Sequence, residues 1–203
     1  MLKALKTASK AIVLIGTPGT GKTETSRILC RVLGATHVSV SSYAIASCLA
    51  TGFDDRRDTY VVDLRSLRAR LERLVMHAER PVIIEGHYLV VGKEAVDSVF
   101  ILRTHPNVLY HRLRRSRRHW SRRKILENVA AEYVGTCLAE VLRVCEDGDL
   151  LCCEIDTTGR RPGEVAIEIL DYLRGRPCKK PPSIDWLGSR VSEELLEGLI
   201  KYV

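Results

Sequence analysis

Short runs of apolar, mostly β-branched residues recur along the chain and predict five buried strands. These strands are expected at residues 11–15, 36–40, 82–84, 99–102 and 151–155. Most of the runs are apolar without alternation, as in strands that are buried on both faces of a sheet. Amphipathic helical patterns separate them. Strands that alternate with helices are typical of a parallel sheet covered by helices on both faces.

Apolar residues that recur with a period of 3.6 predict the helices between the strands. These helices are expected over residues 22–33, 43–51, 63–78, 106–115, 122–146 and 163–173. Glycine and proline mark several ends: Gly52 and Pro81 follow predicted helices, and Pro106 suits a first turn. Residues 53–58 carry charges and are expected to form a loop. The whole pattern predicts an α/β fold with a five-stranded parallel sheet.

The end of the chain differs in composition from the rest. Residues 175–182 contain one glycine, three prolines and two lysines, which is typical of a linker. Beyond them, apolar residues at helical spacing predict an amphipathic helix that Ser192 can cap. We therefore expect a core domain over residues 1–175. A linker and a C-terminal helix are expected over 176–203, with the helix docked on the core or on a partner.

Positive charge is concentrated in one segment. The 203 residues are 45% hydrophobic and 28% charged, as in an ordinary globular domain, but the formal net charge is +7. Of the 32 basic residues, eight lie in residues 111–124. The remaining 24 are balanced by the 25 acidic residues of the chain. The eight are Arg112, Arg114, Arg115, Arg117, Arg118, Arg122, Arg123 and Lys124. A solvated helix face is the plain alternative, but such faces usually mix both signs of charge.

Cysteine usage and hydropathy bound the environment of the protein. The seven cysteines include no C-x-x-C pair, so a zinc site is not expected, and their odd number favours mostly buried, reduced thiols. Arginine outnumbers lysine 23 to 9, a weak indication of a hot source, where intracellular disulfides occur. No apolar run approaches the roughly 20 residues that span a membrane. The apolar stretch near the start is too short for a secretory signal. We therefore expect a cytoplasmic protein without a membrane partner.

Residues 16–23, Gly-Thr-Pro-Gly-Thr-Gly-Lys-Thr, fit the phosphate-loop motif G-x-x-x-x-G-K-[ST] between a strand and a helix. The glycines let successive backbone N–H groups point at phosphate oxygens, and the helix N-terminus adds its dipole. Lys22 can reach the β- and γ-phosphates, and the Thr23 hydroxyl can ligate Mg²⁺. The candidate nucleotide-binding residues here are Gly16, Gly19, Thr20, Gly21, Lys22, Thr23 and Glu24. The Glu24 side chain is expected to point outward.

A second group of polar residues follows the predicted strand at residues 82–84. Glu85, Gly86 and His87 come directly after three apolar residues. Ligands of parallel sheets gather at the carboxyl ends of the strands. Glu85 can orient Mg²⁺ through water, and His87 can orient an attacking group or a water. The plain alternatives are a solvated carboxylate and a histidine that is merely hydrogen-bonded.

Several blocks of the sequence, taken in order, resemble the adenylate kinase isoenzyme 6 family. These blocks are residues 16–23, Phe53-Asp-Asp55, Asp63, Glu85-Gly-His87, residues 100–113, Arg118-His-Trp120 and residues 124–129. The resemblance covers residues 10–173. Members of the family are archaeal and eukaryotic P-loop nucleoside monophosphate (NMP) kinases. They also act in maturation of the small ribosomal subunit.

The resemblance implies a P-loop NTPase fold of the NMP kinase type, with an NMP-binding region near residues 39–63 and a lid near 113–124. It implies transfer of the γ-phosphoryl group of ATP to AMP or a related NMP, with some ATP hydrolysis. A small-subunit ribosomal protein and rRNA are the implied partners. Arg118 matches a lid arginine that contacts ATP, and Thr157 and Thr158 would lie near the adenine.

The chain departs from the family pattern at three places. His119 stands where the lid motif has glycine, Glu85 stands where aspartate is more familiar, and Ser41-Ser42 replaces a common Gly-Asp pair. The last departure leaves the choice of acceptor open.

The expected mechanism needs no covalent intermediate, because positioning and charge neutralisation catalyse phosphoryl transfer. The expected catalytic residues are Lys22, Glu85, His87 and Arg118, and Mg²⁺ is expected on Thr23 and, through water, on Glu85. Three alternatives stay open: an ATPase assembly factor with incidental kinase activity, a metabolite kinase of the shikimate or gluconate kind, and an RNA-binding module that uses the basic segment.

Overall fold

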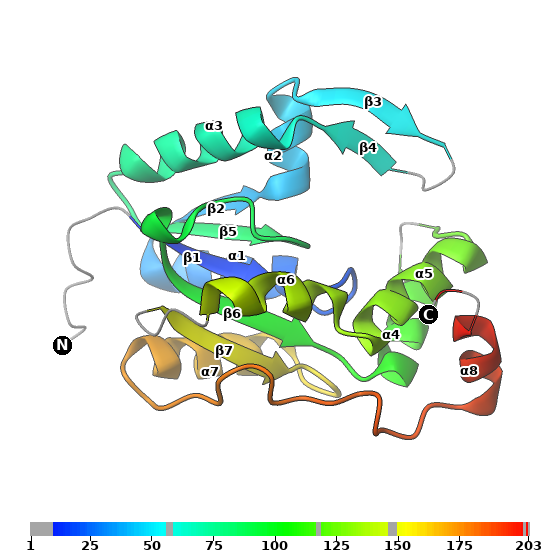
Figure 1. Cartoon of the computed structure of the whole chain (residues 1–203). Helices are drawn as coiled ribbons and strands as arrows, with labels where there is room; N and C mark the ends of the chain where they lie inside the picture. The colour runs from blue at the N-terminus through cyan, green and yellow to red at the C-terminus, as the bar shows by residue number, and fades with distance from the viewer. Residues whose placement is uncertain (1–9, 56–58, 117–118, 146–149, 201, 203) are drawn as a thin grey trace.

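Five strands form one parallel sheet in the order β2-β5-β1-β6-β7 (Figure 1). The computed structural model describes residues 10–55, 59–116, 119–145, 150–200 and 202. The five strands are β1 (Ala11–Ile15), β2 (Thr36–Ser39), β5 (Val82–Gly86), β6 (Val96–Arg103) and β7 (Leu151–Asp156). Every neighbouring pair is parallel, so the predicted sheet is confirmed.

Helices cover both faces of the sheet. The helices in the described part of the chain are α1 (Lys22–Leu33), α2 (Val40–Ala46), α3 (Leu64–Met76), α4 (Pro106–Arg114), α5 (Arg122–Tyr133), α6 (Thr136–Cys145), α7 (Pro162–Leu173) and α8 (Glu193–Leu199), with a short 3₁₀ turn at Lys93–Ala95. Val13 and Ile84 enter a core with α3 and α6, whereas Leu14 and Ile83 enter a core with α1 and α7. Successive strand residues point to opposite faces. Both faces are buried, and this is why the strands read as continuous apolar runs.

Polar side chains fix the starts of two predicted helices. The Asp63 carboxylate accepts hydrogen bonds from the N–H groups of Arg65 (3.0 Å) and Ser66 (3.2 Å) at the start of α3. The Ser121 hydroxyl accepts one from the N–H of Lys124 (3.2 Å) at the start of α5. These contacts satisfy N–H groups that have no partner within a helix.

A β-hairpin replaces part of a predicted helix and the charged loop after it. The helix expected over residues 43–51 ends at Ala46, and the chain continues as β3 (Ala50–Asp54) and β4 (Thr59–Val62), which pair antiparallel. The rings of Phe53 and Tyr60 meet edge to face across the hairpin, 5.1 Å apart. The helix prediction was wrong here because, in so short a segment, the helical period of 3.6 cannot be told apart from the strand period of 2. Cross-strand pairing stabilises the strands instead.

The single long helix expected over residues 122–146 is also wrong, because two helices occupy this segment. Gly135 lies between α5 and α6 with φ +72°, in the left-handed region. The Val134 N–H still bonds to the Ala130 carbonyl at the end of α5. Glycine adopts this conformation without the steric cost that a Cβ brings, and it often ends a helix. The apolar face continues past the break, so periodicity alone does not reveal it.

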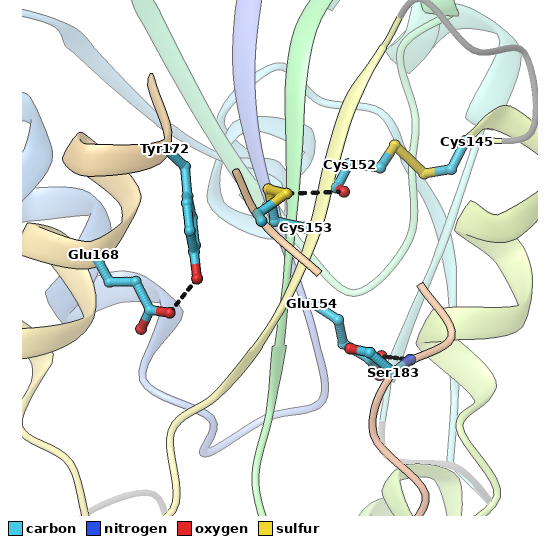
Figure 2. Close-up of a disulfide and its surroundings, with 8 residues drawn as sticks. Cys145, Cys152, Cys153, Glu154, Glu168, Tyr172 and Ser183 are labelled. Atoms are coloured by element: carbon cyan, nitrogen blue, oxygen red, sulfur yellow. Dashed lines mark hydrogen bonds between the residues drawn. A yellow bond between two sulfur atoms is a disulfide. The ribbon is translucent and has the colours of Figure 1, made fainter. Parts of the chain in front are cut away.

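Four of the seven cysteines form disulfides, which corrects the expectation of mostly reduced thiols. Cys145 is bonded to Cys152, and Cys153 to Cys178. Figure 2 shows the two bridges leaving β7 from neighbouring residues. Neighbours on a strand point to opposite faces. Cys152 therefore meets the end of α6, while Cys153 meets the chain after α7.

A third apolar cluster joins the helices at the end of the sheet where the strands finish. Its buried members are Leu109, Leu113, Ile125, Val129, Ala130, Leu195 and Leu199. These residues come from α4, α5 and α8, so the C-terminal helix packs against the body of the protein. The segment before α8 runs along β7 (Figure 1), and the Glu154 N–H donates to the Lys179 carbonyl there. The predicted linker is thus attached along its course.

Candidate nucleotide site

The phosphate loop joins β1 to α1 and requires glycine at two close approaches. A Cβ on Gly16 would lie 2.4 Å from the Leu102 carbonyl oxygen, and one on Gly19 would lie 2.8 Å from a Leu109 methyl group. Gly19 also has φ +89°, a left-handed value. The loop therefore packs directly against the end of β6 and against α4.

Lys22 lies inside this loop. Its side-chain ammonium donates to the carbonyl oxygens of Gly16 (2.6 Å) and Thr17 (2.9 Å), and the residue is only 6% exposed. The Thr20 hydroxyl donates to the same Thr17 carbonyl (2.9 Å). The loop backbone therefore fixes the position of the ammonium group. The exposed Glu24 pairs with Arg27 (2.9 Å) and also lines the cavity next to the loop, so its outward orientation stays a prediction.

Thr23 and Glu85 meet across the site. The Thr23 hydroxyl lies 2.9 Å from both oxygens of the Glu85 carboxylate, which is buried near the end of β5. The His37 Nε2 atom on β2 lies 3.7 Å from one of these oxygens. The His87 Nδ1 atom lies 3.2 Å from the Gly16 carbonyl oxygen. That oxygen only accepts, so His87 donates through a protonated Nδ1.

A cavity of about 350 Å³ brings these groups together. Its lining residues are Pro18, Gly19, Gly21, Lys22, Thr23, Glu24, Ser39, Ser41, Ser42, Glu85, Gly86, His87, Arg112 and Trp120. The loop and the Thr23–Glu85 pair thus face the same space as the two serines at the start of α2. A polyphosphate and a second polar group can lie side by side in such a space.

Arg112 is a candidate that the sequence placed only within the basic segment. From α4 it donates to the Thr157 carbonyl (2.7 Å), and it lies 3.4 Å from the Gly19 carbonyl oxygen. Burial lowers the pKa of Arg112, and Asp156 partly opposes this. Leu109 and Leu113, on the same helix as Arg112, contact Gly19 of the phosphate loop. Helical spacing together with the packing of α4 against the loop would therefore have identified Arg112.

The loop after β7 supplies the two predicted adenine-side threonines. The Thr157 hydroxyl is buried, donates to the Arg103 carbonyl (2.9 Å) and lies 2.6 Å from the Thr104 hydroxyl. The Thr158 hydroxyl accepts from the His105 N–H (2.9 Å). Both side chains therefore hold the loop against the end of β6. Arg118, the predicted lid arginine, lies outside the described residues.

Glu132 was missed by the sequence analysis. Its carboxylate, 1% exposed, accepts a hydrogen bond from the Thr17 hydroxyl of the phosphate loop (2.7 Å). The signal was present, because Glu132 stands three residues after Val129 and seven after Ile125, on the apolar face of α5. A carboxylate at a buried helical position requires partners.

Comparison with known proteins places the chain among archaeal relatives. Residues 12–135 match a family model described as an AAA domain. A Saccharolobus solfataricus protein named "Putative adenylate kinase" is 33% identical over 193 residues, covering 95% of each chain. A Thermococcus gammatolerans protein of the same name is 35% identical over 188 residues, covering 93% of this chain and 98% of the relative.

Solved structures share the fold at low identity. A sugar kinase from Janibacter aligns with a TM-score of 0.54 at 17% identity, over 81% of this chain and 94% of the other. Thymidylate kinase from Candida albicans aligns with a TM-score of 0.52 at 14% identity, over 82% and 91%. Within the described part of the chain, no helix is long and apolar enough to cross a membrane. The chain has the fold of P-loop kinases, and it belongs to the family of the archaeal relatives named above.

Proposed function

We propose that this protein is a nucleoside monophosphate kinase that transfers the γ-phosphoryl group of ATP to AMP or a related NMP. The observation that carries the proposal is one cavity lined by Lys22, the Thr23–Glu85 pair and Arg112. Phosphoryl transfer needs cations around the phosphates and oxygen donors for a metal ion, and these residues supply both. The names of the archaeal relatives support the same activity.

The residues beside the loop fit Mg²⁺. The Thr23 hydroxyl and the Glu85 carboxylate are oxygen donors, which this ion prefers, and they lie 2.9 Å apart at the cavity. Thr23 would hold the ion directly and Glu85 through water. When bound, Mg²⁺ neutralises charge on the phosphate oxygens.

Two cationic side chains act on the polyphosphate in this proposal. Lys22 reaches toward the β- and γ-phosphates from its place in the loop. The Arg112 guanidinium, which also lines the cavity, offers a planar fork that suits phosphate. Arg118 is proposed, from the resemblance, to close over the γ-phosphate as part of a lid near residues 113–124. Thr157 and Thr158 are proposed to border the adenine.

The acceptor would occupy the side of the cavity next to α2. Ser39, Ser41 and Ser42 line it there with hydroxyl groups, within the proposed NMP-binding region near residues 39–63. His87 lines the same cavity, beside the phosphate loop. It would orient the attacking phosphate oxygen or, without an acceptor, a water.

An acceptor screen tests the proposal. ATP consumption is measured with AMP, dAMP, CMP, UMP, GMP, shikimate and gluconate, each against an acceptor-free control. At least one NMP is expected to raise ATP consumption several-fold and to yield the diphosphate. Lys22→Ala should lower this rate by about a hundred- to a thousandfold, the range for loss of one charge-stabilising donor. Lys10→Ala, an exposed lysine before β1, is the matched control. An acceptor-independent rate identical for all compounds would favour the ATPase alternative instead.

A second role, in small-subunit ribosome maturation with rRNA as partner, is proposed from the basic segment. Arg114, Arg115, Arg122 and Arg123 are exposed on α4 and α5 and at their junction, away from the cavity lining. Clustered arginines bind phosphate backbones through a strongly salt-dependent term. Replacing these four by glutamine should weaken RNA binding and flatten its salt dependence. Equal binding by both proteins would remove this role.

A further inference from the structure

Glu132 is the centre of a buried hydrogen-bond network that joins α5 to the phosphate loop. One carboxylate oxygen accepts from the Thr17 hydroxyl (2.7 Å). The other accepts from the Arg103 Nε (2.7 Å), the Thr104 N–H (3.1 Å) and the Trp186 indole N–H (3.0 Å). Four donors on one carboxylate fix its position in every direction.

Arg103 connects Glu132 to β7. It is 2% exposed, and its Nη1 atom donates to the Glu154 carboxylate (2.6 Å). Burial by itself disfavours the charged guanidinium, but Glu132 and Glu154 outweigh it, and the pKa of Arg103 is raised. Replacing such a group of charges by apolar residues often leaves stability unchanged. The positions that the Arg103–Glu132–Glu154 group imposes on its neighbours are therefore more informative than its contribution to stability.

The chain after α7 completes this network from outside the core. The other Glu154 oxygen accepts from the N–H groups of Ser183 (2.6 Å) and Ile184 (3.0 Å), and Figure 2 shows Glu154 meeting Ser183. Trp186 lies three residues after Ser183, and its indole reaches Glu132. The Cys153–Cys178 bridge attaches the same segment to β7.

The network ends at the lysine of the phosphate loop. The Thr17 hydroxyl is held by Glu132, and the Thr17 carbonyl accepts from the Lys22 ammonium (2.9 Å). Glu132 therefore contacts the loop at the same residue whose carbonyl accepts from Lys22. Thr17 is 1% exposed, so its hydroxyl is shielded from bulk solvent.

We propose that Glu132 is a positioning residue of the phosphate loop, that it sets Lys22 through Thr17, and that Trp186 of the C-terminal segment holds Glu132 for this purpose. The proposal rests on the proposed function only in that the loop binds ATP. It assigns the segment around Trp186 to the nucleotide site, although none of the described residues after α7 lines the cavity.

Removal of the Thr17 hydroxyl tests the first step. Thr17→Val keeps the shape but leaves one Glu132 oxygen without its donor, whereas Thr17→Ser keeps the hydroxyl. Affinity for a fluorescent ATP analogue is measured without acceptor, together with thermal unfolding. Thr17→Val should weaken binding about tenfold or more, the scale on which orienting hydrogen bonds act, and Thr17→Ser should restore it. Binding by Thr17→Val equal to that of the unmodified protein would overturn the proposal.

Thr25→Val is the matched control. Thr25 is a buried threonine on α1 whose hydroxyl has no hydrogen-bond partner within the described structure. The same substitution there removes a hydroxyl without touching Glu132, so affinity for the ATP analogue should stay unchanged. A loss equal to that of Thr17→Val would mean that any buried change near the loop has this effect, and the proposal would fall.

Trp186→Phe tests whether Trp186 holds Glu132 in place, and it leaves the sequence of the phosphate loop unchanged. It removes the indole N–H and keeps an aromatic ring, so KM for ATP should rise while KM for the acceptor stays unchanged. Combined with Thr17→Val, the loss should be smaller than the product of the two separate losses, because both act through Glu132. Independent losses would remove Trp186 from the proposal.

Failure of every NMP as acceptor, with these binding results intact, would contradict only the proposed function.

Discussion

The Thr23 hydroxyl lies 2.9 Å from each oxygen of the Glu85 carboxylate, although 62 residues separate them in the chain. The strand order explains the contact. β5 pairs directly with β1, so the end of β5 lies beside the loop that leaves β1. A hydroxyl from the first turn of α1 and a carboxylate from a neighbouring strand thus face the same cavity.

The Glu85 carboxylate is expected to set the dependence of turnover on Mg²⁺. Glu85→Gln keeps the size of the side chain and removes its charge. Turnover should fall about 10- to 100-fold, the range for groups that orient a metal ion's ligands, and the Mg²⁺ concentration for half-maximal rate should rise. The rate measured across an Mg²⁺ titration checks both effects. Glu79→Gln, an exposed carboxylate outside the site, should behave like the unmodified protein.

The Arg112 guanidinium is expected to act on the phosphates and not merely to hold α4. Arg112→Lys keeps a positive charge but loses the planar fork, so turnover should fall by about a hundred- to a thousandfold. Steady-state kinetics with varied ATP provide the measurement. The exposed Arg31→Lys on α1 serves as the control. If Arg112→Lys turns over normally, Arg112 has only its structural contacts with Thr157 and Gly19.

The side chain of His87 is expected to separate hydrolysis from transfer to an acceptor. Its Nδ1–H donates to the Gly16 carbonyl (3.2 Å), and the residue lines the cavity beside the phosphate loop. His87→Ala should change acceptor-free ATP hydrolysis more than AMP phosphorylation. Both rates are measured on the same preparation. An equal loss of both would assign His87 a structural role.

The ionised Glu140 carboxylate is expected to lower the stability of the folded protein at neutral pH. Glu140 lies on α6 beside a cavity of about 820 Å³, and burial raises its pKa above the usual range. The unfolded chain loses this proton at lower pH than the folded protein does. Stability therefore declines as pH rises from the ordinary carboxyl pKa to the raised one, and stays lower above it.

Glu140→Gln removes this charge while keeping the side chain's shape. The Tm of the variant should exceed that of the unmodified protein at pH about 7. The difference should vanish at about pH 3, below the ordinary carboxyl pKa, where the Glu140 carboxyl is protonated in both the folded and the unfolded state. Thermal unfolding at several pH values checks it. A lower Tm for the variant at neutral pH would show that the charged carboxylate is stabilising.

Much of the fold could be predicted because its signals are local. The phosphate loop is eight consecutive residues between a strand and a helix, and residues such as Val13 and Leu14 show burial on both faces within one strand. Glu85 and His87 followed from the rule that ligands gather at strand ends. Each of these inferences needed only neighbours along the chain.

Other features depended on partners distant in the sequence. The β3–β4 hairpin needs Tyr60 opposite Phe53, and the break at Gly135 lies within an unbroken apolar pattern. The disulfides depend on which segments reach the two faces of β7 at Cys152 and Cys153. No local period carries this information.

The sequence by itself determined a phosphate-binding α/β domain, because strand burial, helix period and the glycine loop are properties of short segments. The tertiary structure decided which charged groups meet. Glu132 reaches Thr17 across 115 residues, and Trp186 reaches Glu132 across 54. A buried charge requires several partners at once. Only the assembled fold brings those partners from three parts of the chain to one carboxylate.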